Sequence, residues 1–392
     1  MKMICSESCI ISPLVSIIII ISLSLSLSLT PPVRHNDLAL QLRRFYNNEL
    51  SQVDLHNVTK FATDINRLRA GHVQAQMFAV YVMCGAQEKD AVRLTLEQID
   101  VVRRMCTEYQ EFELVTSVQG LRNSEMKHKI ACLISIEGGH SIDSSLPTLR
   151  MFYLLGVRSM SLTHSCNTPW KVIGLPQMLS ELGMIVDLSH TAWDTASAVL
   201  KHSKAPVIFS HSSSYFICHH HRNVPDWILL EKNRGVIMVN FHRNFITFRD
   251  KANISHVADH FDHIKKLIGA ESIGIGADFE GAVSFPQGLD DVSKYPDLIQ
   301  ELLQRNWTEN EVANILRGNF LRVFEEVERL SLNQPSEVQI PVEEVQNPCR
   351  LVLRPPKPKE HRQSSSSRAH HGPKGLLILA IGLLLSSFFM DE

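Results

Sequence analysis

The segments "GMIVDLSH" (residues 183–190) and "APVIFSHSS" (residues 205–213) decide the fold, because each is an apolar run that closes on a histidine. Continuous apolar runs of this length are typical of parallel strands with both faces covered. The two histidines are His190 and His211. In a parallel barrel the carboxyl ends of the strands share one face, where the residues that perform chemistry lie. The pair therefore predicts a barrel with histidines at its mouth.

Similar apolar runs alternate with amphipathic helical stretches along the chain. Further strands are predicted at residues 77–83, 131–138, 158–164, 235–241 and 272–279. Helices are predicted at residues 89–109, 191–202 and 255–269, and a closing helix begins at Thr308 with Glu311 completing a capping box. This alternation favours an α/β fold, a TIM-like (β/α)8 barrel, over an antiparallel sandwich.

The composition excludes some partners. The chain has 392 residues, of which 44% are hydrophobic, so it can bury a large core. Its 39 basic and 41 acidic residues give a formal net charge of −2. No global field therefore points to nucleic acid, and no nucleic-acid partner is expected. The binding partners must therefore be inferred from individual sites in the sequence.

Acids and further histidines occupy other predicted strand ends. "RSMSLTH" ends on His164, and "LISIEGG" ends on Glu137 before two glycines that let the backbone turn sharply. In "HND", His35 and Asp37 are two residues apart, so on a strand both point the same way. Imidazole nitrogen and carboxylate oxygen suit Zn²⁺, and four or five such ligands with one shared carboxylate suit two ions. Such a pair can bind one hydroxide and polarise a carbonyl, which predicts hydrolysis.

These motifs also have less specific interpretations. A single strand-end histidine is more often a hydrogen-bonded core residue than a ligand, but the whole set in one barrel pattern favours a site. The run "HHHR" (residues 219–222) is interpreted as a solvated loop. "GIGADFEG" (residues 274–281) has no Lys-Ser/Thr pair for a phosphate loop, so it is interpreted as a last barrel strand that delivers Asp278.

The two ends of the chain carry targeting signals. Residues 1–30 contain a long apolar run that is typical of a secretory signal peptide, although an uncleaved N-terminal anchor remains open. A barrel domain is expected at residues 33–332 and a Pro/Ser-rich stalk at residues 333–367. In residues 368–392 a polar spacer and an apolar tail follow Ser364 to Ser367, the order required for a GPI lipid, while the closing "MDE" leaves a short hydrophobic anchor open. Three N-x-S/T sites fit a lumenal route, at Asn57, Asn253 and Asn306.

Several motifs resemble those of the membrane dipeptidase (renal dipeptidase) family of zinc peptidases. They are "EGGHSIDSS", "LTHSCNTPW", "VDLSH", "PVIFSHSS", "RNVPD", "VADHFDHIKKLIG" and "FPQGLDDVSKYP", and the resemblance runs from His35 to Leu330. It implies a TIM-like barrel of the metal-dependent hydrolase type with two zinc ions. It also implies a GPI-anchored protein of the cell surface, on the extracellular face of the plasma membrane. It also implies hydrolysis of dipeptides by a dizinc-bound hydroxide; some members act on cystinyl-bis-glycine or leukotriene D4.

The resemblance also implies residue roles. His35 and Asp37 match ligands of one zinc, Glu137 matches the bridging carboxylate, and His190 and His211 match ligands of the second zinc.

For the substrate, His164 matches the histidine that contacts it and steadies the oxyanion, and Arg222 matches the arginine that grips its carboxylate. Asp278 matches the acid beside the scissile bond and the substrate amine. Catalysis is thus expected from Glu137, His164 and Asp278. A guanidinium fork that holds one carboxylate would restrict the enzyme to dipeptides.

The cysteines follow the family only in part. Cys84 and Cys166 match a family disulfide, and Cys349 lies in the stalk, where family members form the intersubunit bridge of a homodimer. The usual partner of Cys218 lies in a stretch where Phe248 stands here, which puts that second bridge in doubt.

Two departures from the family pattern keep other functions open. The strand that carries His35 is short, and residues 171–182 replace a longer loop and helix, so the barrel is expected to lack cover before His190 and to fold poorly. The main hypothesis is an active zinc dipeptidase. The alternatives are a catalytically weak, dipeptidase-like surface protein that works by binding, and some other metal-dependent amidohydrolase. The sequence does not name the preferred dipeptide.

Overall fold

The computed structural model describes residues 34–168, 174–249 and 251–332 of the chain. The N-terminal leader, the stalk with Cys349, and the C-terminal tail with Ser364 to Ser367 lie outside the described residues, as do residues 169–173 at the shortened connection. Within the described ranges, none of the helices combines the length and the apolar character that crossing a membrane requires.

Eight parallel strands close into a barrel. In chain order the barrel strands are β1 (His35–Asn36), β2 (Ala75–Tyr81), β4 (Ile130–Glu137), β5 (Val157–Ser161), β6 (Ile185–Asp187), β7 (Ile208–Phe209), β8 (Val236–Asn240) and β9 (Ile273–Phe279). Each strand pairs in parallel with the next, and β9 pairs with β1 to close the ring. A further short strand, β3 (Phe112–Leu114), pairs with the first residues of β4. The predicted TIM-like barrel is confirmed.

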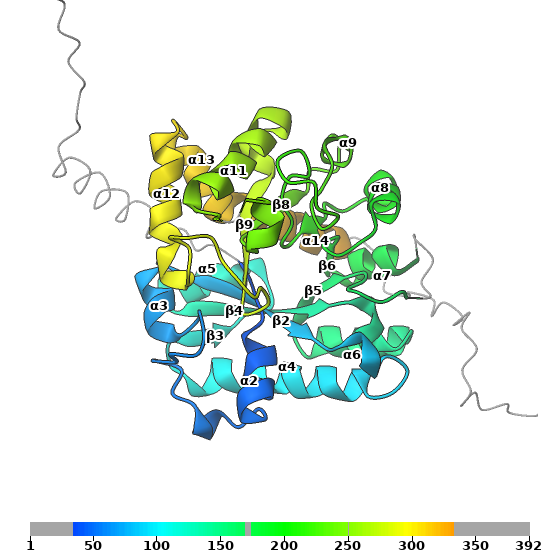
Figure 1. The fold of residues 1–392 in the computed structure, drawn as a ribbon. Coiled ribbons are helices and arrows are strands. Elements are labelled where there is room, and N and C mark those ends of the chain that lie inside the picture. The colour runs from blue at the N-terminus through cyan, green and yellow to red at the C-terminus, as the bar shows by residue number, and fades with distance from the viewer. Residues whose placement is uncertain (1–33, 169–173, 250, 333–392) are drawn as a thin grey trace, which may run out of the picture. The chain divides into compact units, whose positions relative to one another are not determined.

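Helices surround the strands, with α2 and α4 on one side of the barrel and α11, α12 and α13 on another (Figure 1). The helices are α2 (Leu38–Tyr46), α3 (Ile65–Ala70), α4 (Ala91–Glu108), α5 (Val118–Met126), α6 (Leu146–Leu154), α7 (Gly174–Leu182), α8 (Trp193–His202), α9 (Asp226–Leu229), α10 (Arg243–Ile246), α11 (Ile254–Ile268), α12 (Tyr295–Gln304), α13 (Glu309–Ala313) and α14 (Asn319–Leu332). The predicted capping box at Thr308 and Glu311 begins α13. A π-helical turn, Asn314–Gly318, joins α13 to α14.

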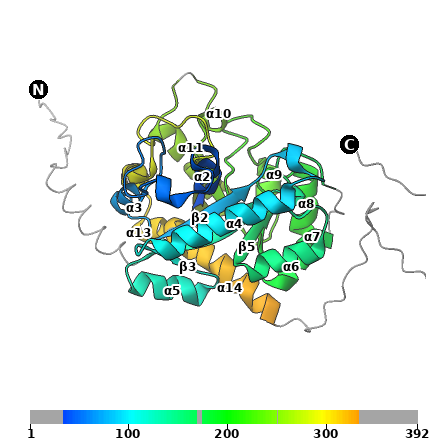
Figure 2. The ribbon, with the colours of Figure 1, turned by 90° about the horizontal axis from the view of Figure 1, so that it is seen from below.

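In several strands, among them β2, β4 and β8, alternate residues belong to two separate cores. Met77, Leu133 and Met238 pack with Phe320 and Phe324 of α14 in one cluster. Their neighbours along the strands pack against the surrounding helices in the other cluster. This period of two places the first cluster inside the barrel. Figure 2 shows α14 crossing the underside of the strands, so the opposite end is left for the site.

The shortened connection does not leave the barrel uncovered, and that expectation was wrong. Helix α7 has 9 residues and buries Leu175, Met178 and Leu179. The adjoining strands β5 and β6 are almost entirely buried. Because α7 also packs against α14, two turns of helix suffice to cover these strands. Strand β1 is short, as expected, with 2 residues.

Candidate metal centre

The predicted site residues meet at the carboxyl ends of the barrel strands. His35 lies in β1, Glu137 ends β4, and Asp278 lies near the end of β9. Asp37 follows β1 and begins α2 as its N-cap. The remaining histidines follow their strands within three residues: His164 after β5, His190 after β6 and His211 after β7. Strand-end placement, which the sequence predicted, therefore brings all of them together.

One carboxylate oxygen of Glu137 faces three imidazoles. Its Oε1 lies 3.0 Å from His190 Nε2, 3.2 Å from His211 Nε2 and 3.8 Å from His164 Nε2. His190 Nε2 and His211 Nε2 are 2.8 Å apart. The rings of His164 and His190 stack, with centroids 4.0 Å apart. We call these four residues the imidazole half of the site.

The other oxygen of Glu137 faces an acidic cluster. Glu137 Oε2 lies 3.7 Å from His35 Nε2. The same nitrogen is 3.2 Å from Asp37 Oδ2 and 3.9 Å from Asp278 Oδ1. We call His35, Asp37 and Asp278, with this oxygen of Glu137, the carboxylate half. The two halves share only Glu137.

The donor atoms fit metal ions. Buried polar atoms normally find hydrogen-bond partners. Here both ring nitrogens of His35 and Oδ2 of Asp37 are buried without a hydrogen bond of acceptable geometry among the described residues. Groups of three ligand atoms close enough to hold an ion occur in both halves, Glu137 with His164 and His190, and His35 with Asp37 and Asp278. A third group, His35 with Glu137 and His211, spans the two halves. Imidazole nitrogens and carboxylate oxygens are ligands that Zn²⁺ and similar ions prefer.

The carboxylate half concentrates negative charge in a buried place. Burial, and then the neighbouring Glu137, raise the pKa of Asp37 to about 6. Burial also raises the pKa of Asp278 well above its ordinary value, against the nearby His35. Burial would raise the pKa of Glu137 too, but His35 and the other imidazoles lower it well below its ordinary value. A cation would relieve this repulsion.

The imidazole half is held neutral. Burial, and then Arg222, lower the pKa of His190 to about 3. Burial, and then His35, lower the pKa of His211 well below its ordinary value. Neutral imidazoles keep a lone pair for a metal ion.

The backbone is strained at the same place. His190 has φ 66°, Ala277 has φ 56° and Asp278 has φ 74°, values that L-residues rarely adopt. Such residues cluster at functional sites, because the surrounding structure must hold them. Gly281 approaches closely as well: a Cβ there would lie 2.4 Å from Asp37 Oδ2 and 2.6 Å from Asp278 Oδ1. The carboxylate half therefore needs glycine at position 281.

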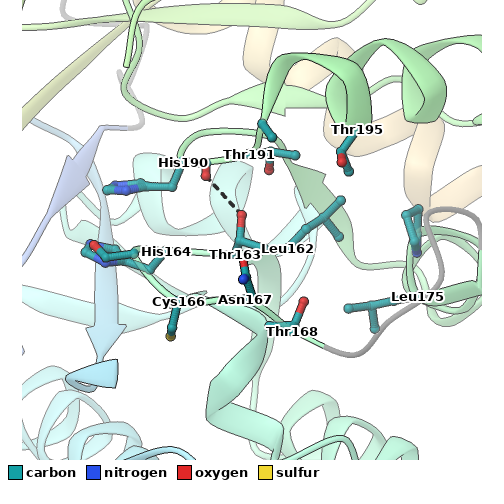
Figure 3. A pocket seen from close by; sticks show the side chains of 13 residues that line it. Leu162, Thr163, His164, Cys166, Asn167, Thr168, Leu175, His190, Thr191 and Thr195 are labelled. Carbon is teal, nitrogen blue, oxygen red and sulfur yellow. Dashed lines mark hydrogen bonds between the residues drawn. The ribbon is translucent and has the colours of Figure 1, made fainter. Parts of the chain in front are cut away.

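Two pockets open beside His190. One, of about 320 Å³, is bordered by His164 and His190 and by the hydroxyls of Thr163 and Thr191 (Figure 3). Thr163 Oγ1 donates a hydrogen bond of 2.9 Å to the carbonyl oxygen of His190, which joins the loops after β5 and β6. The second pocket, of about 330 Å³, is bordered by His190 and Arg222. Arg222 is within reach of the cluster, since one guanidinium nitrogen lies 2.7 Å from His190 Nε2.

The sequence reading missed contacts that support the cluster from behind. Asp187, at the end of β6, accepts hydrogen bonds from Ser189 and Ser210, and Ser210 Oγ lies 2.7 Å from His211 Nδ1. Asn240, at the end of β8, donates a hydrogen bond of 3.2 Å to Asp278 Oδ2. Both residues end their strands, but in the sequence each also resembles an ordinary strand residue, so the strand-end pattern alone does not identify them.

Two disulfides join cysteines within the described part of the chain. One joins Cys84 and Cys166, the pair that the family resemblance implied. The other joins Cys106 of α4 to Cys132 of β4, a pair that no spacing in the sequence predicts. Cys218 is buried and free, consistent with the loss of its usual partner at position 248. His140 lies near the first pair, but sulfurs joined in a disulfide are not metal ligands.

Surface positions agree with the remaining expectations where the structure describes them. Asn57, Asn253 and Asn306 are exposed, so a glycan could be attached at each. The run at 219–222 is a loop, in which His219 and His221 are exposed. It is not among the groups of described residues that could hold a metal ion.

The chain matches a model of the family described as membrane dipeptidase, Peptidase family M19, over residues 33–172 and 175–338. The interruption falls in the shortened connection. Dipeptidase 3 of Mus musculus is 46% identical over 357 residues, covering 84% of this chain and 72% of that protein. Dipeptidase 3 of Homo sapiens is 48% identical over 331 residues, covering 79% and 67%.

Solved structures share the fold. A metallo peptidase from Rhodobacter sphaeroides, liganded with a phosphinate mimic of the dipeptide L-Ala-D-Ala, superimposes with a TM-score of 0.70 at 22% identity and covers 76% of this chain and 99% of that one. A probable dipeptidase from Pseudomonas aeruginosa gives a TM-score of 0.70 at 17% identity, with 79% and 99% covered. At these identities the likeness shows the fold alone.

Proposed function

The chain belongs to the membrane dipeptidase family, Peptidase family M19, and from this premise we propose that it is a two-zinc dipeptidase of the cell surface. Membership itself establishes a metallopeptidase that hydrolyses peptide bonds. The proposal adds the identity and number of the metal ions, the roles of individual residues, the substrates and the location.

A single observation carries the two-ion proposal. The two oxygens of Glu137 face different ligand groups, Oε1 toward His190 and His211 and Oε2 toward His35. A carboxylate that presents one oxygen to each group is the arrangement that a bridged pair of ions needs. We assign His35, Asp37 and Glu137 to one zinc, and Glu137, His190 and His211 to the other.

When bound, the two ions supply Lewis acidity and lower the pKa of a water molecule. The chain's own groups do the rest. Hydrolysis adds water across the peptide bond, so a proton must move to the leaving amine. Asp278 Oδ1 faces the cluster while Oδ2 is held by Asn240, and we assign that free oxygen to carry the proton. We assign His164 Nε2 to the developing oxyanion, because it lies at the rim of the cluster.

Arg222 accounts for the restriction to dipeptides. Its guanidinium lies next to His190, at the border of one pocket. A carboxylate held there in bidentate fashion must belong to the residue that follows the scissile bond. A longer peptide has no carboxylate at that position. Dipeptides with bulky side chains, such as cystinyl-bis-glycine or leukotriene D4, are the substrates we propose within this class.

The location and assembly are proposed from the chain ends. An N-terminal signal peptide, a GPI site within Ser364 to Ser367 and a homodimer bridge at Cys349 together describe an anchored ectoenzyme. The exposed Asn57, Asn253 and Asn306 suit glycosylation in the secretory pathway.

A second candidate function rests on the interrupted family match between residues 172 and 175. The interruption falls between the loop that carries His164 and helix α7. A chain that keeps the pocket but loses catalysis would be a dipeptidase-like surface protein that works by binding. The same measurements separate the two functions.

The test uses the purified full chain. Two zinc ions per subunit are expected, with hydrolysis of alanyl-alanine but not of its C-terminal amide or of trialanine. Two bound zinc ions without hydrolysis of any dipeptide would favour the binding protein. Absence of bound zinc would reject the two-ion site, and equal hydrolysis of the amide would reject the role of Arg222.

A further inference from the structure

A buried carboxylate lies directly behind one of the proposed zinc ligands. Asp187 is 4% exposed and ends β6, next to the first turn of the loop that carries His190. It is connected to the proposed ligands through Ser210, the residue before His211, whose hydroxyl contacts both Asp187 and the His211 ring.

The directions of these hydrogen bonds follow from the donors present. The backbone N–H groups of Ser189 and Ser210 both donate to Asp187 Oδ1, each at 2.9 Å. Asp187 Oδ2 is left to the hydroxyl of Ser210, at 2.5 Å. A carboxylate only accepts, so Ser210 must donate its single proton to Asp187.

The hydroxyl of Ser210 then has only lone pairs to offer His211. Ser210 Oγ lies 2.7 Å from His211 Nδ1, so this contact is made by a proton on Nδ1. The proton is thereby kept off Nε2, the atom that faces Glu137 Oε1 at 3.2 Å. A histidine binds a metal ion only through an unprotonated nitrogen.

We infer that Asp187 is a positioning residue that acts through Ser210 to hold His211 in the tautomer whose Nε2 can bind a metal ion. The inference rests on the proposed zinc site. No corresponding relay fixes His35, whose Nδ1 has no hydrogen-bond partner among the described residues.

Asp187→Asn is the informative change because it keeps the shape of the side chain and favours the opposite direction for the hydrogen bonds that run from residue 187 through Ser210 to His211. The amide oxygen can still accept from Ser189 and Ser210, while the amide nitrogen donates to Ser210 Oγ. The hydroxyl proton of Ser210, no longer held by a carboxylate, is then free to be donated to His211 Nδ1, which favours the tautomer with the ring proton on Nε2. Ser210→Ala only removes the relay and leaves His211 free to adopt either tautomer.

The experiment measures zinc affinity by chelator competition, with the melting temperature of the metal-free protein as a separate readout. Asp187→Asn creates an Asn-Leu-Ser sequon, so all proteins are produced in the bacterial periplasm, which forms disulfides without N-glycosylation. Asp187→Asn should weaken the affinity for one zinc about 10- to 100-fold. Ser210→Ala should weaken it less, and the double variant should recover part of the loss.

Asp64→Asn is the matched control. Asp64 is also 4% exposed and accepts hydrogen bonds from backbone N–H groups, but it caps α3. The change should leave zinc affinity unchanged.

The order of the variants separates a positioning role from a structural one. If Asp187 only stabilised the fold, the double variant would bind zinc more weakly than either single variant, and zinc affinity would fall in step with the melting temperature. Either result would overturn the inference. Parental zinc affinity in Asp187→Asn would overturn it as well. Failure of the two-zinc proposal is recognised separately, because the parent protein would then bind no zinc at all.

Discussion

The histidines at the barrel mouth and His260 in α11 have much in common but differ in their partners. Burial lowers the pKa of His190 to about 3 and that of His260 to about 4. His260 Nδ1 accepts a hydrogen bond of 3.0 Å from the backbone N–H of Ser214, and its Nε2 donates one of 2.9 Å to Ile246 O. Both of its nitrogens are therefore satisfied.

At the mouth, by contrast, the Nε2 atoms of His190 and His211 face each other at 2.8 Å with Glu137 beside them. The guanidinium of Arg222 donates to His190 Nε2 at 2.7 Å. His211 Nε2 then faces only the His190 nitrogen and a carboxylate oxygen, so its lone pair is left for a cation when the ring proton is on Nδ1. Burial and a lowered pKa therefore do not distinguish a ligand from a scaffold residue. The unsatisfied lone pair does.

The largest effect is expected at the carboxylate that both halves share. Glu137→Gln removes the charge facing His35, His190 and His211 and turns an amide N–H toward imidazole lone pairs. Loss of an outer contact to a ligand typically costs about 10- to 100-fold, so loss of the shared ligand should lower zinc affinity and dipeptide hydrolysis by more than about 100-fold. Metal analysis and a hydrolysis assay measure the two quantities.

Glu328→Gln is the control for this change. Glu328 is half-buried in α14 and accepts a hydrogen bond from the backbone N–H of Val118, away from the mouth. It should keep both zinc ions and full turnover. A Glu137→Gln protein that did the same would show that the cluster is a hydrogen-bonded core and not a site.

The next effect concerns His260 and stability. Its pKa is about 4 in the folded chain against an ordinary 6.5, so below pH 6.5 the unfolded state binds the extra proton. The stability that neutral His260 contributes is complete above pH 6.5 and falls by about 3 kcal/mol as the pH drops to about 4, with no further loss below. His260→Gln, which can make both hydrogen bonds without titrating, should remove this part of the pH dependence.

Urea unfolding between pH 7 and pH 4 measures the difference between the parent and the His260→Gln protein. His202→Gln is the matched control, because His202 is exposed in the last turn of α8. Equal pH slopes for the parent and His260→Gln would contradict the prediction. Zinc content should stay the same in both variants, because neither His260 nor His202 belongs to the cluster at the barrel mouth.

The sequence predicted the barrel and its mouth because both depend on local patterns. Apolar runs define the strands, and parallel strands must end on one face, so Glu137 and His211 could be assigned before their distance was known. The same pattern missed Asp187, since a single acid inside "MIVDLSH" resembles a strand residue until its partner Ser210 comes from another strand.

What could not be predicted depends on distant segments. The disulfide between Cys106 and Cys132 joins a helix to a strand, and sequence spacing does not define which helix face meets which strand. The length of the helix before β6 led to the expectation that β5 and β6 would be poorly covered. The two turns of α7 bury Leu175 and Leu179 fully, so position mattered more than length.

A smaller effect is expected for substrate binding. Arg222→Lys keeps the charge but loses the fork that can hold a carboxylate by two hydrogen bonds, so KM for a dipeptide should rise about tenfold while kcat changes less. Zinc content should be parental, in contrast to Glu137→Gln. Kinetics with alanyl-alanine test this, and an unchanged KM would remove Arg222 from the substrate site.

The smallest effect is expected where histidines are densest. His219 and His221 are exposed, and neither belongs to the groups of described residues that could hold a metal ion. His220 differs from its neighbours, since its Nδ1 accepts the backbone N–H of Arg222, and it is left in place. The double variant His219→Gln and His221→Gln removes two imidazoles without touching an unsatisfied lone pair at the mouth. Zinc content should therefore be unchanged and kcat/KM should stay within about twofold, because substitutions of exposed residues usually have little effect. A loss of zinc in this variant would mean that the number of imidazoles, and not the geometry around Glu137, determines where the metal binds.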